Sequence, residues 1–351
     1  MTGTRIAIVL LGLAALGSAP LAAQNVSVQG IDSIHLRANV QPRFDTTSVD
    51  GEPGTAWELR RARVMFRMFA AGWVRADVEA DFGRGRARLT DGFVQLSFDP
   101  RFVVRAGQFK KPFDTLELTS SREILVVERD GLPRGASLPT PTGLAGDLGY
   151  SDRDLGAEWR GRFGAATVIA GFWNGAGTDV EDDDGKQVAG RVEIAAPGGW
   201  KVAGAWSGLR RSAPQDAPDE DGTWSNAFEL AGTYGAYAEP GAKVLLHAMF
   251  GDGESADDPA VDDPSFRALQ AILAWHLATY DVPYLIGVEP VARFGWADPD
   301  GDGDDDEATL FTAGVNLYHH ERVKTHLQVD HVSPAERDGE TAVRFQTTLG
   351  F

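Results

Sequence analysis

Arginine side chains recur at alternating positions in the first third of the sequence. Arg61, Arg63 and Arg67 follow one such spacing, and residues two apart in a β-strand lie on the same face. Guanidinium groups present planar donors that match oxyanions such as phosphate. The pattern therefore predicts an anion-binding row on one face of neighbouring strands. The row comprises Arg37, Arg43, Arg61, Arg63, Arg67 and Arg75, with Arg105 joining from a later strand.

An alternative interpretation is that these arginines only balance nearby carboxylates. Asp77, Glu79 and Asp81 lie on the following strand and could pair with the three arginines at 61, 63 and 67. Charge is nevertheless segregated, because residues 33–111 carry 14 basic and 9 acidic side chains, whereas residues 112–351 carry 18 basic and 41 acidic ones. The net charge of −18 excludes a general nucleic-acid-binding surface.

Period-two alternation of apolar and polar residues predicts β-strands through most of the chain. In residues 33–45, for example, apolar side chains at even positions oppose polar ones at odd positions. We expect sixteen strands, at 33–45, 57–70, 73–82, 89–98, 102–111, 153–161, 166–174, 187–195, 200–207, 224–235, 243–250, 267–277, 285–296, 309–318, 323–331 and 342–351.

The connections between these segments alternate between short turns and long polar stretches. The long ones are expected at 46–56, 83–88, 112–152, 175–186, 208–223, 251–266, 297–308 and 332–341. This alternation is typical of an all-β, transmembrane, antiparallel up-and-down β-barrel, and strands of about 10 residues suffice to span its apolar band. The apolar face would then contact lipid, and the charged face would line a water-filled lumen. A secreted β-sandwich or propeller is the alternative.

The N-terminus predicts export from the cytoplasm. Arg5 precedes the apolar run 6–16 and the small residues that end near Ala23, which together are typical of a secretory signal peptide. We therefore expect residues 1–23 to be removed and residues 24–351 to form a single outer-membrane barrel domain. The chain ends on Phe351, and a terminal aromatic residue of this kind is typical of strands read by the barrel assembly machinery.

Other chemistries find little support in the sequence. The absence of cysteine excludes disulfides and thiolate sites. His319 and His320 lie at a turn and His331 toward the opposite rim, so they do not predict a metal site. Residues 298–304 resemble the start of a calcium loop, but Thr309 occupies the position that needs a glutamate. No serine and histidine spacing singles out a barrel hydrolase. We expect no enzyme activity, cofactor or bound metal.

An ordered set of segments resembles the phosphate-selective porin O and P family of Gram-negative outer membranes. The segments are Glu58–Arg63, Asp77–Gly83, Arg105–Phe113, Leu118–Arg122, Asp152–Gly156, Phe172–Gly175, Glu289–Phe294 and the closing strand. The resemblance implies a sixteen-stranded porin that forms homotrimers and whose third outer loop, here 112–152, folds into the pore. It also implies anion-binding roles for Lys110 and Lys111, which precede that loop.

The function expected from these features is passive diffusion of small hydrophilic solutes through a channel, with a preference for anions such as phosphate or polyphosphate. The 112–152 loop carries three arginines, no lysine and seven carboxylates. A general non-selective or cation-tolerant porin therefore remains an alternative, as does a barrel hydrolase. The expected partners are solutes, outer-membrane lipid and two further copies of the chain.

Overall fold

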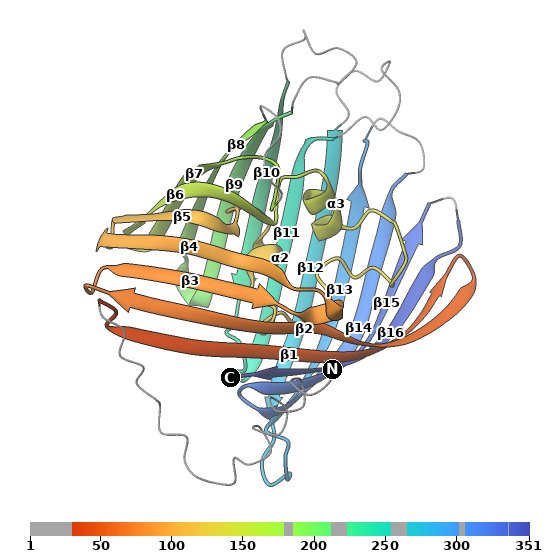
Figure 1. Ribbon diagram of the computed structural model, residues 1–351. Coiled ribbons are helices and arrows are strands. Elements are labelled where there is room, and N and C mark those ends of the chain that lie inside the picture. The colour runs from red at the N-terminus through yellow and green to blue at the C-terminus, as the bar shows by residue number, and fades with distance from the viewer. Residues whose placement is uncertain (1–29, 179–184, 212–222, 254–264, 302–305, 336) are drawn as a thin grey trace, which may run out of the picture.

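Hydrogen bonding between neighbours in sequence closes the strands into one barrel. The computed structural model describes residues 30–178, 185–211, 223–253, 265–301, 306–335 and 337–351. Each strand pairs antiparallel with the next, and β1 pairs with β16, so that the sheet has no free edge (Figure 1). Closure includes Phe44 opposite Phe345, and the backbone N–H of Phe351 donates to the carbonyl of Ala38 at 2.9 Å. The predicted sixteen-stranded up-and-down barrel is confirmed.

The strand bounds follow the predicted segments closely. The strands are β1 (Ser33–Val49), β2 (Glu52–Ala70), β3 (Val74–Asp81), β4 (Arg88–Asp99), β5 (Phe102–Lys110), β6 (Arg153–Phe163), β7 (Ala166–Trp173), β8 (Lys186–Ala195), β9 (Trp200–Arg210), β10 (Trp224–Tyr234), β11 (Gly241–Asp252), β12 (Ser265–Ala278), β13 (Gly287–Asp298), β14 (Ala308–His320), β15 (Val323–Pro334) and β16 (Glu340–Gly350). The short helices are η1 (Gly83–Gly85), α2 (Thr115–Leu118), α3 (Pro141–Asp147) and η2 (Pro197–Gly199).

Apolar side chains point outward from the barrel and polar ones inward. On adjacent strands, Leu36, Phe66 and Val78 are 64%, 47% and 41% exposed, whereas Gln41 and Asp77 are buried inside. The sequence expectation about the two faces is therefore confirmed. None of the helices in the described ranges is long and apolar enough to cross a bilayer.

The expected long connection at 46–56 is wrong. β1 continues to Val49 and β2 begins at Glu52, so that a two-residue turn, Asp50 and Gly51, joins them. Both turn residues have positive φ (51° and 77°), which suits the twist of a tight hairpin. The threonines and serine before the turn resemble a loop in composition, but they pair in register with residues 53–55.

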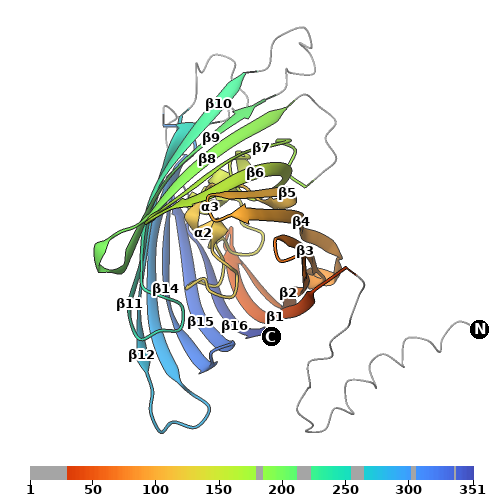
Figure 2. The same cartoon turned by 90° about the vertical axis from the view of Figure 1, so that its left-hand side faces the viewer.

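The long connection between β5 and β6 lies inside the barrel. Figures 1 and 2 show its helices α2 and α3 within the barrel outline from two directions. Its apolar residues pack against inward-facing residues of the wall: Leu116, Ile124 and Val126 contact a buried cluster that includes Ile272 and Val291. We call residues 111–152 the inserted segment. It gives part of the lumen an apolar core, which the alternation pattern of the strands did not predict.

Two groups of predicted features lie outside the described residues. These are the signal peptide at 1–23 and parts of the long connections predicted at 175–186, 208–223, 251–266 and 297–308.

Candidate functional site

Side chains of β10 and β15 hold one face of the inserted segment against the barrel wall. Glu229 on β10 accepts hydrogen bonds from the backbone N–H groups of Asp114 and Thr115, at 2.9 and 2.8 Å. Gln328 on β15 accepts from the Val127 N–H at 2.9 Å, and Lys324 donates to the Ile124 carbonyl at 2.8 Å. These contacts hold the segment against the strands that follow β9.

Two cavities remain between the inserted segment and the arginine-bearing wall. The Arg37 cavity has a volume of about 320 Å³ and is lined by Arg37, Arg63, Glu79, Lys110, Arg122 and Arg153, among others. The Arg60 cavity has a volume of about 330 Å³ and is lined by Arg60, Arg61, Arg63, Glu128, Asp130 and Arg153, among others. Because both cavities are lined by Arg63 and Arg153, they adjoin each other along this wall, and we call the two together the route.

The register between β1 and β2 orders the arginines along that route. Along the β1–β2 pair, Arg37 lies opposite Met65, Asn39 lies opposite Arg63, and Gln41 lies opposite Arg61. Inward-facing residues therefore place guanidinium groups at successive levels of the wall. The predicted row of arginines on β1, β2 and β3 faces the lumen, as does Arg105 on β5.

Most arginines of the row are paired with carboxylates. Arg63 pairs with Asp81 at 2.7 Å, and Arg67 and Arg75 both pair with Asp77, at 2.7 and 2.8 Å. Arg105 pairs with Glu158 at 2.9 Å. The charge-balancing interpretation is confirmed for Arg63 and Arg67.

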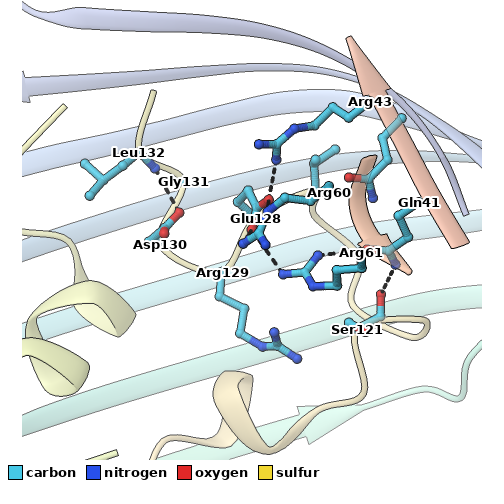
Figure 3. Close-up of polar contacts among 12 residues, drawn as sticks. Gln41, Arg43, Arg60, Arg61, Ser121, Glu128, Arg129, Asp130, Gly131 and Leu132 are labelled. Atoms are coloured by element: carbon cyan, nitrogen blue, oxygen red, sulfur yellow. Dashed lines mark hydrogen bonds and ion pairs between the residues drawn. The ribbon is translucent and has the colours of Figure 1, made fainter. Parts of the chain in front are cut away.

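The expected pairing of Arg61 with β3 is wrong, because its partner is Glu128 of the inserted segment. Figure 3 shows Arg43, Arg60 and Arg61 converging on this carboxylate. Arg60 contacts Glu128 through both Nε and Nη2, the latter at 3.1 Å, and Arg61 Nη2 lies 3.3 Å from Glu128 Oε2. Arg43 Nη1 also donates to Glu128. Burial acts to raise the pKa of Glu128, but the three arginine charges outweigh it and hold this pKa well below its ordinary value.

Arg60 was missed because strict alternation assigns it to the lipid face. The β1–β2 register shifts between Gln41 and Pro42, which pair with Arg61 and Leu59 and leave Arg60 as the extra residue of a β-bulge. Its side chain consequently lines the lumen beside that of Arg61. The high cost of an arginine at the lipid midplane is the sequence signal that could have identified it.

The two predicted lysines have different surroundings. Lys110 lines the Arg37 cavity and pairs with Glu117 at 2.7 Å. Lys111 is buried at the base of the inserted segment, where it donates to the Gly149 carbonyl at 2.7 Å and to Gln187 at 2.8 Å. Burial lowers the pKa of Lys111 to about 8. Lys111 lines neither cavity and anchors the inserted segment, so the geometry does not support the expected anion-binding role.

Two cations of the Arg37 cavity are left without an acidic partner in the described part of the chain. Across the ranges that the structure describes, no ion pair joins Arg37 or Arg122 to a carboxylate. Both side chains are partly exposed and line the Arg37 cavity. Arg122 was not predicted, because it lies in the inserted segment, where strand alternation gives no information about direction. In the same described ranges, no group of three or more potential metal ligands is found.

Solved structures confirm the architecture. The chain is similar to the outer-membrane channel DcaP of Acinetobacter baumannii, with 11% identity, a TM-score of 0.67, and 93% of this chain and 99% of that one covered. The anion-selective porin from Comamonas acidovorans is 13% identical, has a TM-score of 0.67, and is matched over 91% of this chain and 99% of that one. OmpF of Salmonella typhi, solved in complex with daunomycin, is 14% identical, has a TM-score of 0.64, and is matched over 92% of this chain and 98% of that one. At these identities the likeness shows the fold.

A sequence comparison identifies the family. No curated relative matches the chain. The family model for phosphate-selective porin O and P matches residues 34–206, which run from β1 into β9 and include the arginine-bearing wall and the inserted segment. Together with the closed sixteen-stranded barrel, this match shows that the chain is an outer-membrane porin of the phosphate-selective porin O and P family.

Proposed function

We propose that this porin passes small hydrophilic solutes by diffusion and prefers anions such as phosphate. The observation that carries the proposal is the pair of unneutralised cations, Arg37 and Arg122, beside a route that guanidinium groups line at successive levels. Charges at a constriction set the selectivity of a wide channel. The family description and the Comamonas acidovorans porin, whose name states anion selectivity, point in the same direction.

The reversal potential across a planar bilayer under a KCl gradient tests the preference. We expect chloride to permeate better than potassium. At ~5 Å in water one unit charge changes the energy of a permeating monovalent ion by about 0.8 kcal/mol, which is a factor of about four. Removing both charges in Arg37→Gln with Arg122→Gln should therefore lower the chloride-to-potassium permeability ratio by more than about fourfold. Arg322→Gln, at an exposed short turn outside both cavities, is the matched control and should leave the ratio unchanged. Cation preference of the unmodified channel would refute the proposal.

A cation-tolerant or non-selective pore is the second candidate. The inserted segment places Glu117, Glu128, Asp130, Asp147 and Asp152 on the Arg60 cavity, opposite the arginine-bearing wall. These carboxylates offset much of the positive charge at that level. A reversal potential near zero in the experiment above would favour this candidate.

The assembled form is proposed to be a homotrimer of the mature chain. OmpT of Vibrio cholerae, a structural neighbour at TM-score 0.61 and 10% identity, was solved in a trimer form. Light scattering of the detergent-purified protein measures the number of copies. We further propose that residues 1–23 are removed on export, which the intact mass of the membrane-extracted protein measures, and that Phe351 is read during assembly, in which case Phe351→Ala should reduce insertion.

A further inference from the structure

Glu128 has an unusual position, because one carboxylate from the inserted segment receives three guanidinium groups from two adjacent strands. Its Oε1 accepts from Arg43 and from Arg60 Nε, and its Oε2 accepts from Arg60 Nη2 and Arg61 Nη2. Glu128 is 5% exposed. Both oxygens are therefore fully used by the wall (Figure 3).

The three arginines have few other acidic partners. Arg43 also contacts Asp45 and Glu58. Within the described ranges, the only carboxylate paired with Arg60 or Arg61 is that of Glu128, and Arg61 otherwise donates to the side-chain oxygen of Gln41 at 2.8 Å. Without the Glu128 charge, two adjacent guanidinium groups at the edge of the route would lack a counterion.

The position of Glu128 does not depend on its own charge. Arg293 of β13 donates to the carbonyl oxygens of Glu128 and Arg129, at 3.0 and 2.8 Å, and Gln328 accepts from the preceding Val127 N–H. These three backbone contacts fix the chain on both sides of the residue. A neutral side chain at position 128 would consequently leave the segment in place.

We propose that Glu128 is an internal competitor for oxyanions, whose carboxylate occupies the position that a phosphate would take among Arg43, Arg60 and Arg61. A carboxylate and a phosphate present similar oxygen pairs to guanidinium donors. The adjoining Arg60 cavity of about 330 Å³ has room for a hydrated oxyanion, since one water occupies about 30 Å³. Glu128 would thus allow anions to pass this level of the wall without being retained. The inference rests on the proposed anion route and assigns the residue that tunes it.

The test is block of chloride current by inorganic phosphate in single channels. We expect Glu128→Gln to lower the half-blocking phosphate concentration about tenfold or more, which corresponds to about 1.4 kcal/mol. Glu321→Gln is the matched control, because it removes one carboxylate at an exposed short turn that lines neither cavity. The control should leave the half-blocking concentration within about twofold of the unmodified channel, as expected for one partly screened charge.

Two further variants separate the specific effect from a folding defect. Glu128→Asp keeps the net charge and shortens the side chain by one methylene, which moves the carboxylate away from the arginines. Its half-blocking phosphate concentration should lie between that of the unmodified channel and that of Glu128→Gln. Adding Arg61→Gln to Glu128→Gln should return the block toward that of the unmodified channel. Equal block in Glu128→Gln and Glu321→Gln, or no change in either Glu128 variant, overturns the inference.

The two tests fail in distinguishable ways. Anion preference of the unmodified channel with no gain of block in the Glu128 variants would reject the internal competitor and retain the anion route. Cation preference of the unmodified channel would reject the anion route and, with it, the inference that rests on this route.

Discussion

Replacing Arg293 with methionine should loosen the inserted segment while leaving the barrel closed. Arg293 is 2% exposed and donates to two carbonyls of the segment, to Thr312 Oγ1 at 2.9 Å and to Asp330 Oδ1 at 2.9 Å. Methionine has a similar length and no donor. Asp330 keeps its contacts with Gln328 and Arg344, so the wall itself retains a paired carboxylate.

The free energy by which this substitution should weaken the attachment of the segment follows from the two hydrogen bonds that Arg293 donates to it. A hydrogen bond from a charged donor contributes about 1.5–3 kcal/mol, so their joint loss weakens this anchor by about 3–6 kcal/mol if the two add. The segment remains attached through Glu229 and Lys324. It should therefore move within the lumen rather than leave it.

Two measurements report this movement. Single-channel recordings of Arg293→Met should show increased current noise and a changed conductance. Trypsin should cleave after Arg134, an exposed residue of the segment, at least several times faster than in the unmodified protein. Arg267→Met, on the neighbouring strand β12 and exposed, is the control and should behave as the unmodified channel. Unchanged noise together with unchanged cleavage would refute the reasoning.

Two other predictions concern pH and backbone geometry. Because the pKa of Glu128 is held well below its ordinary value of 4.5, its contribution to stability is fully present above that value and is lost only as pH falls through the depressed pKa. In infrared difference spectra between the unmodified protein and Glu128→Gln, the carboxylate band should persist from pH 7 down to pH 4.5, the ordinary pKa of a glutamate, and a protonated band at pH 5 would contradict the assignment. Gly107→Ala should lower the thermal unfolding temperature of the barrel and reduce its insertion, because residue 107 has φ of 131° and an added Cβ would lie 2.3 Å from the Gly92 carbonyl oxygen. Gly190→Ala, whose added Cβ would come no closer than 3.7 Å to another residue, is its control, and equal melting of the two variants would exclude the clash.

The strands, their order and the direction of most side chains follow from the amino-acid sequence alone. Alternation is a local property: once Arg61 and Arg63 face inward, Val64 and Phe66 on the same strand face lipid wherever the neighbours lie. A sheet in which each strand pairs with its neighbours in sequence has two unpaired edge strands. Pairing the first strand with the last closes the barrel and removes these edges. These features need information from within a few residues only, which explains why all sixteen strands could be predicted.

Which charges remain available in the lumen depends on contacts between residues that are far apart in the sequence. The inward direction of Arg60 depends on a bulge in the pairing of β1 with β2, and the two-residue turn after Val49 depends on the same pairing. The partner of Arg61 is Glu128, 67 positions away, because the inserted segment crosses the lumen at that level. Such contacts depend on how that segment packs against the opposite wall, and alternation within a strand carries no information about that packing.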